Sequence, residues 1–169
     1  MSSTVPRFED LVNEHKDMVF NLLFRLTGDY HLSQDLFQET FIKVYRNMNT
    51  FQSRSKPSTW IYSIAVNVFR DHSRKREPLP LTKGEPTLPT DEANPETQVI
   101  RSLEQEEIQK KVRDLRESIR IPLVLYYVEG LTVQQISEIT GRSPSDIKVS
   151  LHRARKKLRQ GFENERRLS

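Results

Sequence analysis

The sequence predicts an all-α protein with two small helical domains joined by a flexible, proline-rich linker, the second domain containing a helix-turn-helix. Apolar residues recur every three or four positions through most of the 169 residues, which is the spacing of amphipathic helices. Five of the nine prolines lie between Pro78 and Pro95, where they disfavour helix. A short turn at Gly141 joins two amphipathic segments. We therefore expect helical domains at 1–76 and 101–169, with a linker at 77–100.

Three helices are expected in the first domain. The first covers residues 8–26 and ends at Gly28, which suits a left-handed C-cap. The second covers residues 34–48, with Ser33 as its N-cap. The third opens at Pro57 and runs to residue 76.

The third helix is expected to have an apolar face toward the core and a polar face toward solvent. The inward set is Ile61, Ile64, Ala65 and Val68, and the outward set is Tyr62, Ser63, Asn67, Arg70 and Arg74. Aromatic residues alternate with basic ones along this segment, a combination that suits stacking on unpaired bases. Burial in the core is an equally good interpretation for Trp60 and Phe69.

In the second domain, residues 96–115 lead into an apolar helix that ends at Gly130. Thr132 is expected to cap the next helix, and Ser143 the one after it, with Pro144 and Asp146 in the first turn. The inward face of this helix pair is expected to be Ile136, Ile139, Ile147 and Leu151. A second helix held in this way enters the major groove of DNA.

Composition argues against several other classes of function. The chain has no cysteine, and its four histidines are scattered, so we expect no metal site, cofactor or catalytic residue. No segment is apolar enough to span a membrane, and the N-terminus does not resemble a signal peptide.

Basic residues outnumber acidic ones in 54–76 and 141–160, while 77–107 is acidic. Two basic blocks favour contact with a polyanion over two ordinary solvated faces.

The segments DLFQETFIKVYRN, TWIYSIAVNVFRDHSRKR and GLTVQQISEITGRSPSDIKVSLHRARKKL occur in this order, with the proline-rich stretch between the second and third. Together they resemble the extracytoplasmic-function (ECF) sigma factors of bacterial RNA polymerase. The resemblance implies a non-enzymatic factor that directs core polymerase to the −35 and −10 promoter elements and helps to open the DNA. It also implies contact with the β′ coiled coil and the β flap, and with an anti-sigma factor. Its implied location is the cytoplasm, either free or held at the membrane by that anti-sigma factor.

The resemblance also implies three sets of site residues, the last of which agrees with the outward face of the second helix of the helix-turn-helix. Core polymerase would contact Asp35, Leu36, Gln38, Glu39 and Phe41. Single-stranded −10 DNA would contact Phe51, Ser53, Arg54, Trp60, Tyr62, Asn67, Arg70 and Arg74. Duplex −35 DNA would contact Lys148, Val149, His152 and Arg153 through base edges, and Arg155 and Lys156 through phosphates.

Two alternatives remain open on the sequence alone. A one-component helix-turn-helix regulator would bind duplex DNA without docking on polymerase, and its first domain would carry a ligand pocket or dimer face. A protein-interaction adaptor would tolerate loss of the −10 surface.

Overall fold

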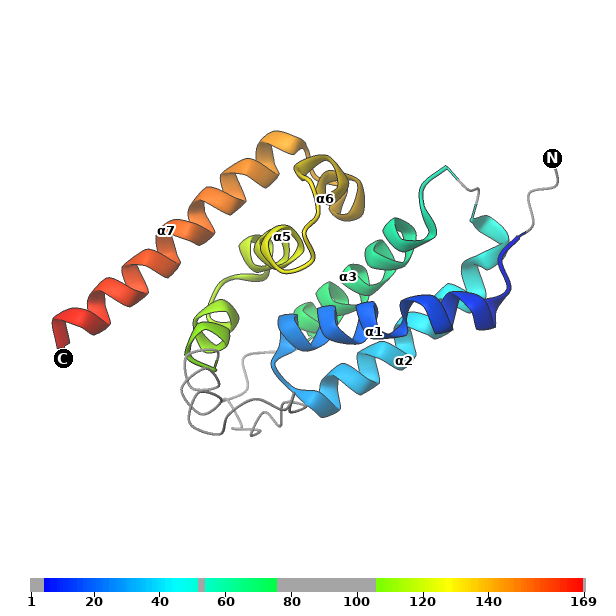
Figure 1. Ribbon diagram of the computed structural model, residues 1–169, viewed down its shortest axis with the longest axis horizontal. Coiled ribbons are helices and arrows are strands. Elements are labelled where there is room, and N and C mark those ends of the chain that lie inside the picture. The colour runs from blue at the N-terminus through cyan, green and yellow to red at the C-terminus, as the bar shows by residue number, and fades with distance from the viewer. Residues whose placement is uncertain (1–4, 52–53, 76–105, 169) are drawn as a thin grey trace, which may run out of the picture.

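The computed structural model describes residues 5–51, 54–75 and 106–168, and all regular structure within these ranges is helical (Figure 1). The labelled helices are α1 (Phe8–Thr27), α2 (Tyr30–Asn47), the short 3-10 helix η1 (Met48–Thr50), α3 (Pro57–Lys75), α5 (Glu117–Tyr127), α6 (Val133–Thr140) and α7 (Pro144–Leu168). Residues 106–113 form a further helical segment. The predicted linker at 77–100 and the predicted DNA contact Ser53 lie outside the described residues.

Helix α1 ends where the sequence predicts. Gly28 adopts a φ of 66°, and its backbone N–H donates to the carbonyl of Phe24 at 2.8 Å. A side chain at this position would be strained by the left-handed backbone and would also meet Arg113, because a Cβ would lie 2.3 Å from its Cδ. The C-cap of the first helix therefore also contacts the C-terminal part of the chain.

The predicted start of α2 is wrong by one turn. Asp29, not Ser33, is the N-cap, and its carboxylate accepts from the N–H of Leu32 at 3.0 Å. Ser33 is buried within the helix, where its hydroxyl donates to the carbonyl of Asp29 at 2.6 Å. Aspartate is as good an N-cap as serine, and the earlier start lets Leu32 pack against the core.

Helix α3 begins at Pro57, as predicted, but more of its surface is buried than the sequence predicts. Tyr62 was expected to point into solvent, and it is only 6% exposed. Val66 and Phe69 are buried as well as the predicted inward residues Ile61, Ala65 and Val68. The helix is covered on two sides because it packs against α1 and α2 and also against α5 and α6.

The helix-turn-helix at α6 and α7 has the expected caps and core. Thr132 accepts from the N–H of Gln135, whose side chain accepts from the N–H of Thr132, so α6 begins with a complete capping box. Ser143 accepts from the N–H of Asp146 at 3.2 Å at the start of α7. Gly141 has a φ of 71° in the turn. The predicted inward residues, Ile136, Ile139, Ile147 and Leu151, are all buried.

The N-terminal half (residues 5–75) and the C-terminal half (106–168) pack directly on each other. Figure 1 shows α5 and α6 lying between α7 and the bundle of α1, α2 and α3. One cluster of buried apolar side chains crosses the boundary, joining Leu26 and Ile61 to residues such as Ile121, Leu125 and Ile136. The sequence does not predict this packing, since it gives the length of the linker but not the contacts between the domains.

Candidate nucleic-acid and protein interfaces

The outward face of α7 carries all six residues predicted to contact −35 DNA. Lys148, Val149, His152, Arg153, Arg155 and Lys156 are exposed. Val149 is 47% exposed, which leaves its methyl groups available to a thymine methyl. The opposite face is fixed in the core by Ile147, Leu151 and Ala154.

Two arginines, Arg142 in the turn before α7 and Arg155 on α7, contact α5. Arg142, which the sequence reasoning missed, donates from Nη1 to the carbonyl of Ser118 at 2.6 Å and from Nη2 to the hydroxyl of Ser150. These bonds fix the turn before α7 against α5, so Arg142 positions the exposed helix. Arg155 donates to the Tyr127 hydroxyl at 2.9 Å.

The predicted protein-docking residues of α2 divide into two groups. Asp35, Gln38 and Glu39 are exposed, whereas Leu36 and Phe41 are 2% and 6% exposed and pack in the core. The buried pair therefore holds α2 in place and presents no side chain to a partner in this arrangement.

The exposed side of α2 continues into two apolar residues that were not among the predicted contacts. Ile42 is 50% exposed and Tyr45 is 65% exposed, and they follow Gln38 and Glu39 at helical spacing. An apolar residue on the polar side of an amphipathic helix was the signal that could have identified Ile42. The surface of α2 thus combines acidic groups near its start with apolar groups near its end.

The residues predicted to contact −10 DNA do not form one continuous surface. Phe51 and Trp60 lie against each other at the start of α3, with ring centroids 4.8 Å apart and planes tilted by 32°. Both rings are half-buried, and Arg54 nearby in sequence is exposed. Asn67 and Arg74 are exposed further along the helix, and Arg70 is half-buried.

Tyr62 does not share this exposed surface, because the C-terminal half covers it. Its hydroxyl donates to Oε2 of Glu129 at 2.7 Å. Burial raises the pKa of Tyr62, and the hydrogen bond and negative charge of Glu129 raise it further. The phenol is therefore held neutral as a hydrogen-bond donor.

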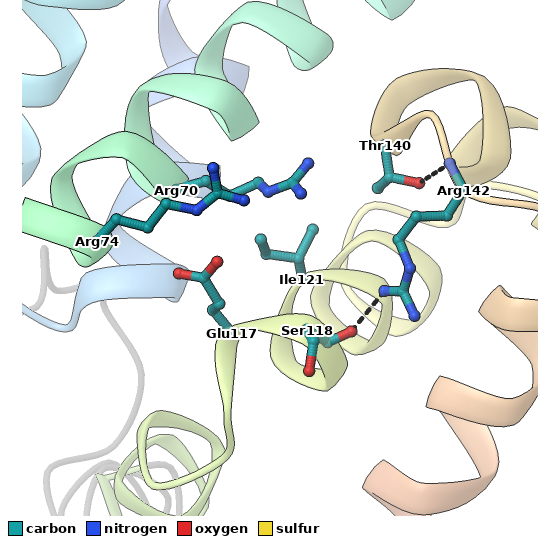
Figure 2. A pocket seen from close by; sticks show the side chains of 7 residues that line it. All are labelled: Arg70, Arg74, Glu117, Ser118, Ile121, Thr140 and Arg142. Atoms are coloured by element: carbon teal, nitrogen blue, oxygen red, sulfur yellow. Dashed lines mark hydrogen bonds between the residues drawn. The ribbon is translucent and has the colours of Figure 1, made fainter.

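A cleft of about 260 Å³ lies at the seam between α3 and the C-terminal half (Figure 2). Its lining consists of Arg70, Arg74, Glu117, Ser118, Ile121, Thr140 and Arg142. Within the described ranges, Arg70 and Arg74 form no ion pair within 4.0 Å, so their guanidinium groups remain available to an anion. The seam therefore brings positive charge from α3, together with the carboxylate of Glu117, beside the turn that precedes α7.

Among the described residues, none of the helices has both the length and the apolar character needed to cross a membrane. In the same part of the chain, histidine and carboxylate side chains form no group of three that could hold a metal ion.

Comparison with known proteins identifies the class to which this fold and these surfaces belong. Residues 11–78 match the family described as Sigma-70 region 2, and residues 105–158 match Sigma-70, region 4. The chain is 32% identical over 163 residues to the ECF RNA polymerase sigma factor SigW of Bacillus subtilis (strain 168), a match covering 90% of this chain and 87% of that protein. It is 30% identical to the RNA polymerase sigma factor YlaC of the same organism, covering 94% and 93% of the two chains.

The chain belongs to the sigma-70 family. Within that family, it is a member of the ECF RNA polymerase sigma factors. A solved structure with the same fold is the sigma factor RpoE from Bartonella quintana, determined in complex with the anti-sigma factor NepR. Its TM-score is 0.73 at 19% identity, covering 92% of this chain and 96% of that chain.

Proposed function

We propose that this ECF sigma factor uses three separate surfaces, one each for core polymerase, single-stranded −10 DNA and duplex −35 DNA. It performs no catalysis of its own and acts in the bacterial cytoplasm, where its polymerase partner works. The observation that carries the proposal is the exposure of all six predicted −35 residues on a helix whose other face is anchored in the core. A regulator and a sigma factor share that feature, so the polymerase-docking surface is the one to test.

The −35 reader is the N-terminal half of α7. Lys148 and Arg153 present donors that suit the acceptors of guanine, and Val149 presents methyl groups. Arg155 and Lys156 follow on the same exposed side and supply phosphate contacts, which add affinity without sequence information.

The docking surface for core polymerase is the exposed side of α2. Asp35 and Glu39 would pair with basic residues of the β′ coiled coil, and Gln38 would add a hydrogen bond. Ile42 and Tyr45 extend this surface with apolar area, which supplies affinity that salt does not screen.

The −10 surface is centred on the half-buried pair Phe51 and Trp60. An unpaired base can stack on this pair, and each base–aromatic stack contributes about 1–3 kcal/mol. Arg70 and Arg74 lie along the same helix and would follow the phosphate backbone. Asn67 is exposed and would join them directly, whereas Tyr62 would do so only once the C-terminal half moves away.

We assign this division of labour to domains at 1–76 and 101–169. A fully extended chain of 24 residues, the length of the predicted linker at 77–100, spans at most about 85 Å, so a linker of this length can connect two domains on separate promoter elements. A further protein partner is an anti-sigma factor, since the related RpoE structure contains one. The β flap of the polymerase is the partner expected for the C-terminal half.

The test is transcription by purified core polymerase across a broad promoter library, with and without the protein. We expect promoter-dependent transcripts with the wild-type chain and a loss of at least tenfold in core affinity for the double variant Asp35→Ala, Glu39→Ala. The matched control is Glu14→Ala, Asp17→Ala, which removes the same charge from exposed positions on α1. Equal polymerase affinity of the two double variants would exclude the α2 surface. Duplex binding without any promoter-dependent transcript would favour the one-component regulator instead.

A further inference from the structure

Arg142 connects three helices of the C-terminal half at the turn that precedes α7. Its Nη1 donates to the carbonyl of Ser118 in the first turn of α5 at 2.6 Å, and its Nη2 donates to the hydroxyl of Ser150 on α7. Ser150 is only 3% exposed and lies between Val149 and Leu151, among the predicted −35 contacts. The guanidinium therefore holds α7 at the turn that would read the DNA.

The backbone of Arg142 is also hydrogen-bonded, in this case to α6 (Figure 2). The hydroxyl of Ser137 donates to the carbonyl of Arg142 at 2.6 Å, and the N–H of Arg142 donates to the hydroxyl of Thr140 at 3.4 Å. The side chain thus extends from a fixed point in the turn toward α5 and α7. Ser137, Thr140, Arg142 and Ser150 together form a polar network around the turn, the turn network.

We propose that the turn network determines base discrimination at the −35 element, with Arg142 acting as a positioning residue for α7 and not as a DNA contact. The inference rests on the proposed function, because it takes the exposed side of α7 as the −35 reader. It adds that the accuracy of reading depends on side chains that do not touch the DNA.

The apolar anchors of α7 do not supply the same constraint. Contacts made by Ile147, Leu151 and Ala154 have no preferred direction, whereas a hydrogen bond weakens steeply when its angle departs from linearity. A recognition geometry has to be kept within about 0.5 Å and about 10–20°. Since the two Nη donors of Arg142 lie in one rigid plane, bonding to α5 and α7 at the same time limits both translation and rotation of α7.

A basic side chain at this turn could instead contact a DNA phosphate. Arg142, however, is half-buried with both Nη atoms engaged, so reaching a phosphate would break two hydrogen bonds and remove a donor from the buried Ser150 hydroxyl. Other buried hydroxyls in the described helices, those of Ser33 and Thr40, donate to the carbonyl four residues earlier. Ser150 differs from them because its hydroxyl accepts from Arg142, which favours the positioning role.

The first measurement is base discrimination by holoenzyme reconstituted from core polymerase and the full chain. Its binding is measured on promoter duplexes in which each −35 base is substituted in turn while the −10 element stays constant. Arg142→Met should lower the ratio of affinities between preferred and substituted sequences by about fivefold or more, since one well-placed base contact supplies at least that much.

Three further variants separate the guanidinium fork from its charge. Arg142→Lys keeps the charge but lacks the fork, so it should lose as much discrimination as Arg142→Met. Ser150→Ala removes one of the two acceptors and should change the ratio in the same direction. The matched control is Arg116→Met, which removes the same charge from an exposed residue before α5 and should keep the wild-type ratio.

The second measurement is the salt dependence of duplex binding by the free chain, because each phosphate contact contributes about 0.9 to the logarithmic slope. Arg142→Met should keep the wild-type slope and the wild-type affinity for a duplex that lacks a −35 element. Arg155→Met, at a predicted phosphate contact, should lower the slope by about 0.9 and weaken binding to all duplexes by the same factor. Urea unfolding of each variant gives its folded fraction, since partial unfolding also reduces every affinity by one factor.

Two outcomes would overturn the proposal. One is a wild-type discrimination ratio in both Arg142→Met and Arg142→Lys. The other is a uniform loss of affinity and a lower salt slope in Arg142→Met that Arg142→Lys restores, which would make Arg142 a phosphate contact. Failure of the proposed function is distinct from both, since the wild-type holoenzyme would then show no discrimination among −35 sequences.

Discussion

Replacement of Arg120 provides the sharpest test of how the two halves are held together. Its guanidinium donates to the carbonyls of Leu26 at 2.8 Å and Arg113 at 2.7 Å, and to that of Leu115 from both Nη2 at 2.7 Å and Nε at 3.2 Å. Burial lowers the pKa of Arg120, and the neighbouring carboxylates of Glu117 and Asp114 oppose that shift. One planar side chain therefore satisfies three carbonyl groups, one at the end of α1 and two in the segment that precedes α5.

The expected loss of stability depends on how many carbonyl groups each substitution leaves without a hydrogen-bond donor. Lysine keeps the charge but has a compact ammonium in place of the planar fork, so Arg120→Lys should leave one or two of the carbonyls without a donor. At a net 1.5–3 kcal/mol for a hydrogen bond to a charged group, we expect a loss of about 2–3 kcal/mol. Arg120→Met leaves all three carbonyls unsatisfied, and we expect about 3–5 kcal/mol, reduced by the recovered cost of burying the charge.

Urea unfolding followed by circular dichroism measures these losses as shifts in midpoint at constant slope. Arg116→Lys is the matched control, since Arg116 is exposed four residues earlier and should change stability by less than about 0.5 kcal/mol. A stability for Arg120→Lys equal to that of Arg116→Lys would refute the role assigned to the guanidinium fork.

Two further predictions concern the same boundary. An unfolded tyrosine ionises near pH 10, whereas the pKa of folded Tyr62 is higher, so its contribution to stability is intact below pH 10 and falls by about 1.4 kcal/mol per pH unit above it. The free energy of unfolding, measured by urea titration, should therefore fall more between pH 9 and pH 11 for the wild type than for Tyr62→Phe. Equal decreases for the two proteins would disprove the raised pKa of Tyr62. Gly28→Ala should lower the melting temperature more than Gly141→Ala, because both have positive φ but only the first would meet Arg113; equal losses would mean that Arg113 moves aside freely.

Local chemistry determines most of the fold, and these parts were predictable. The cap at Gly28, the start at Pro57 and the capping residues Thr132 and Ser143 depend on the local sequence, within about four positions of each helix end. The start of α2 was wrong because the stretch offers two competent caps, Asp29 and Ser33. The choice between them depends on what Leu32 and Ser33 contact in three dimensions, which local spacing does not contain.

The candidate site was predictable where exposure follows from periodicity. The outward residues of α7 are those left over once Ile147 and Leu151 face the core, and the structure agrees. The same reasoning gives the wrong exposure for Tyr62, because α3 also packs against the C-terminal half, which is distant in sequence. A helix covered on two sides has two inward faces, and a single amphipathic stripe accounts for only one of them.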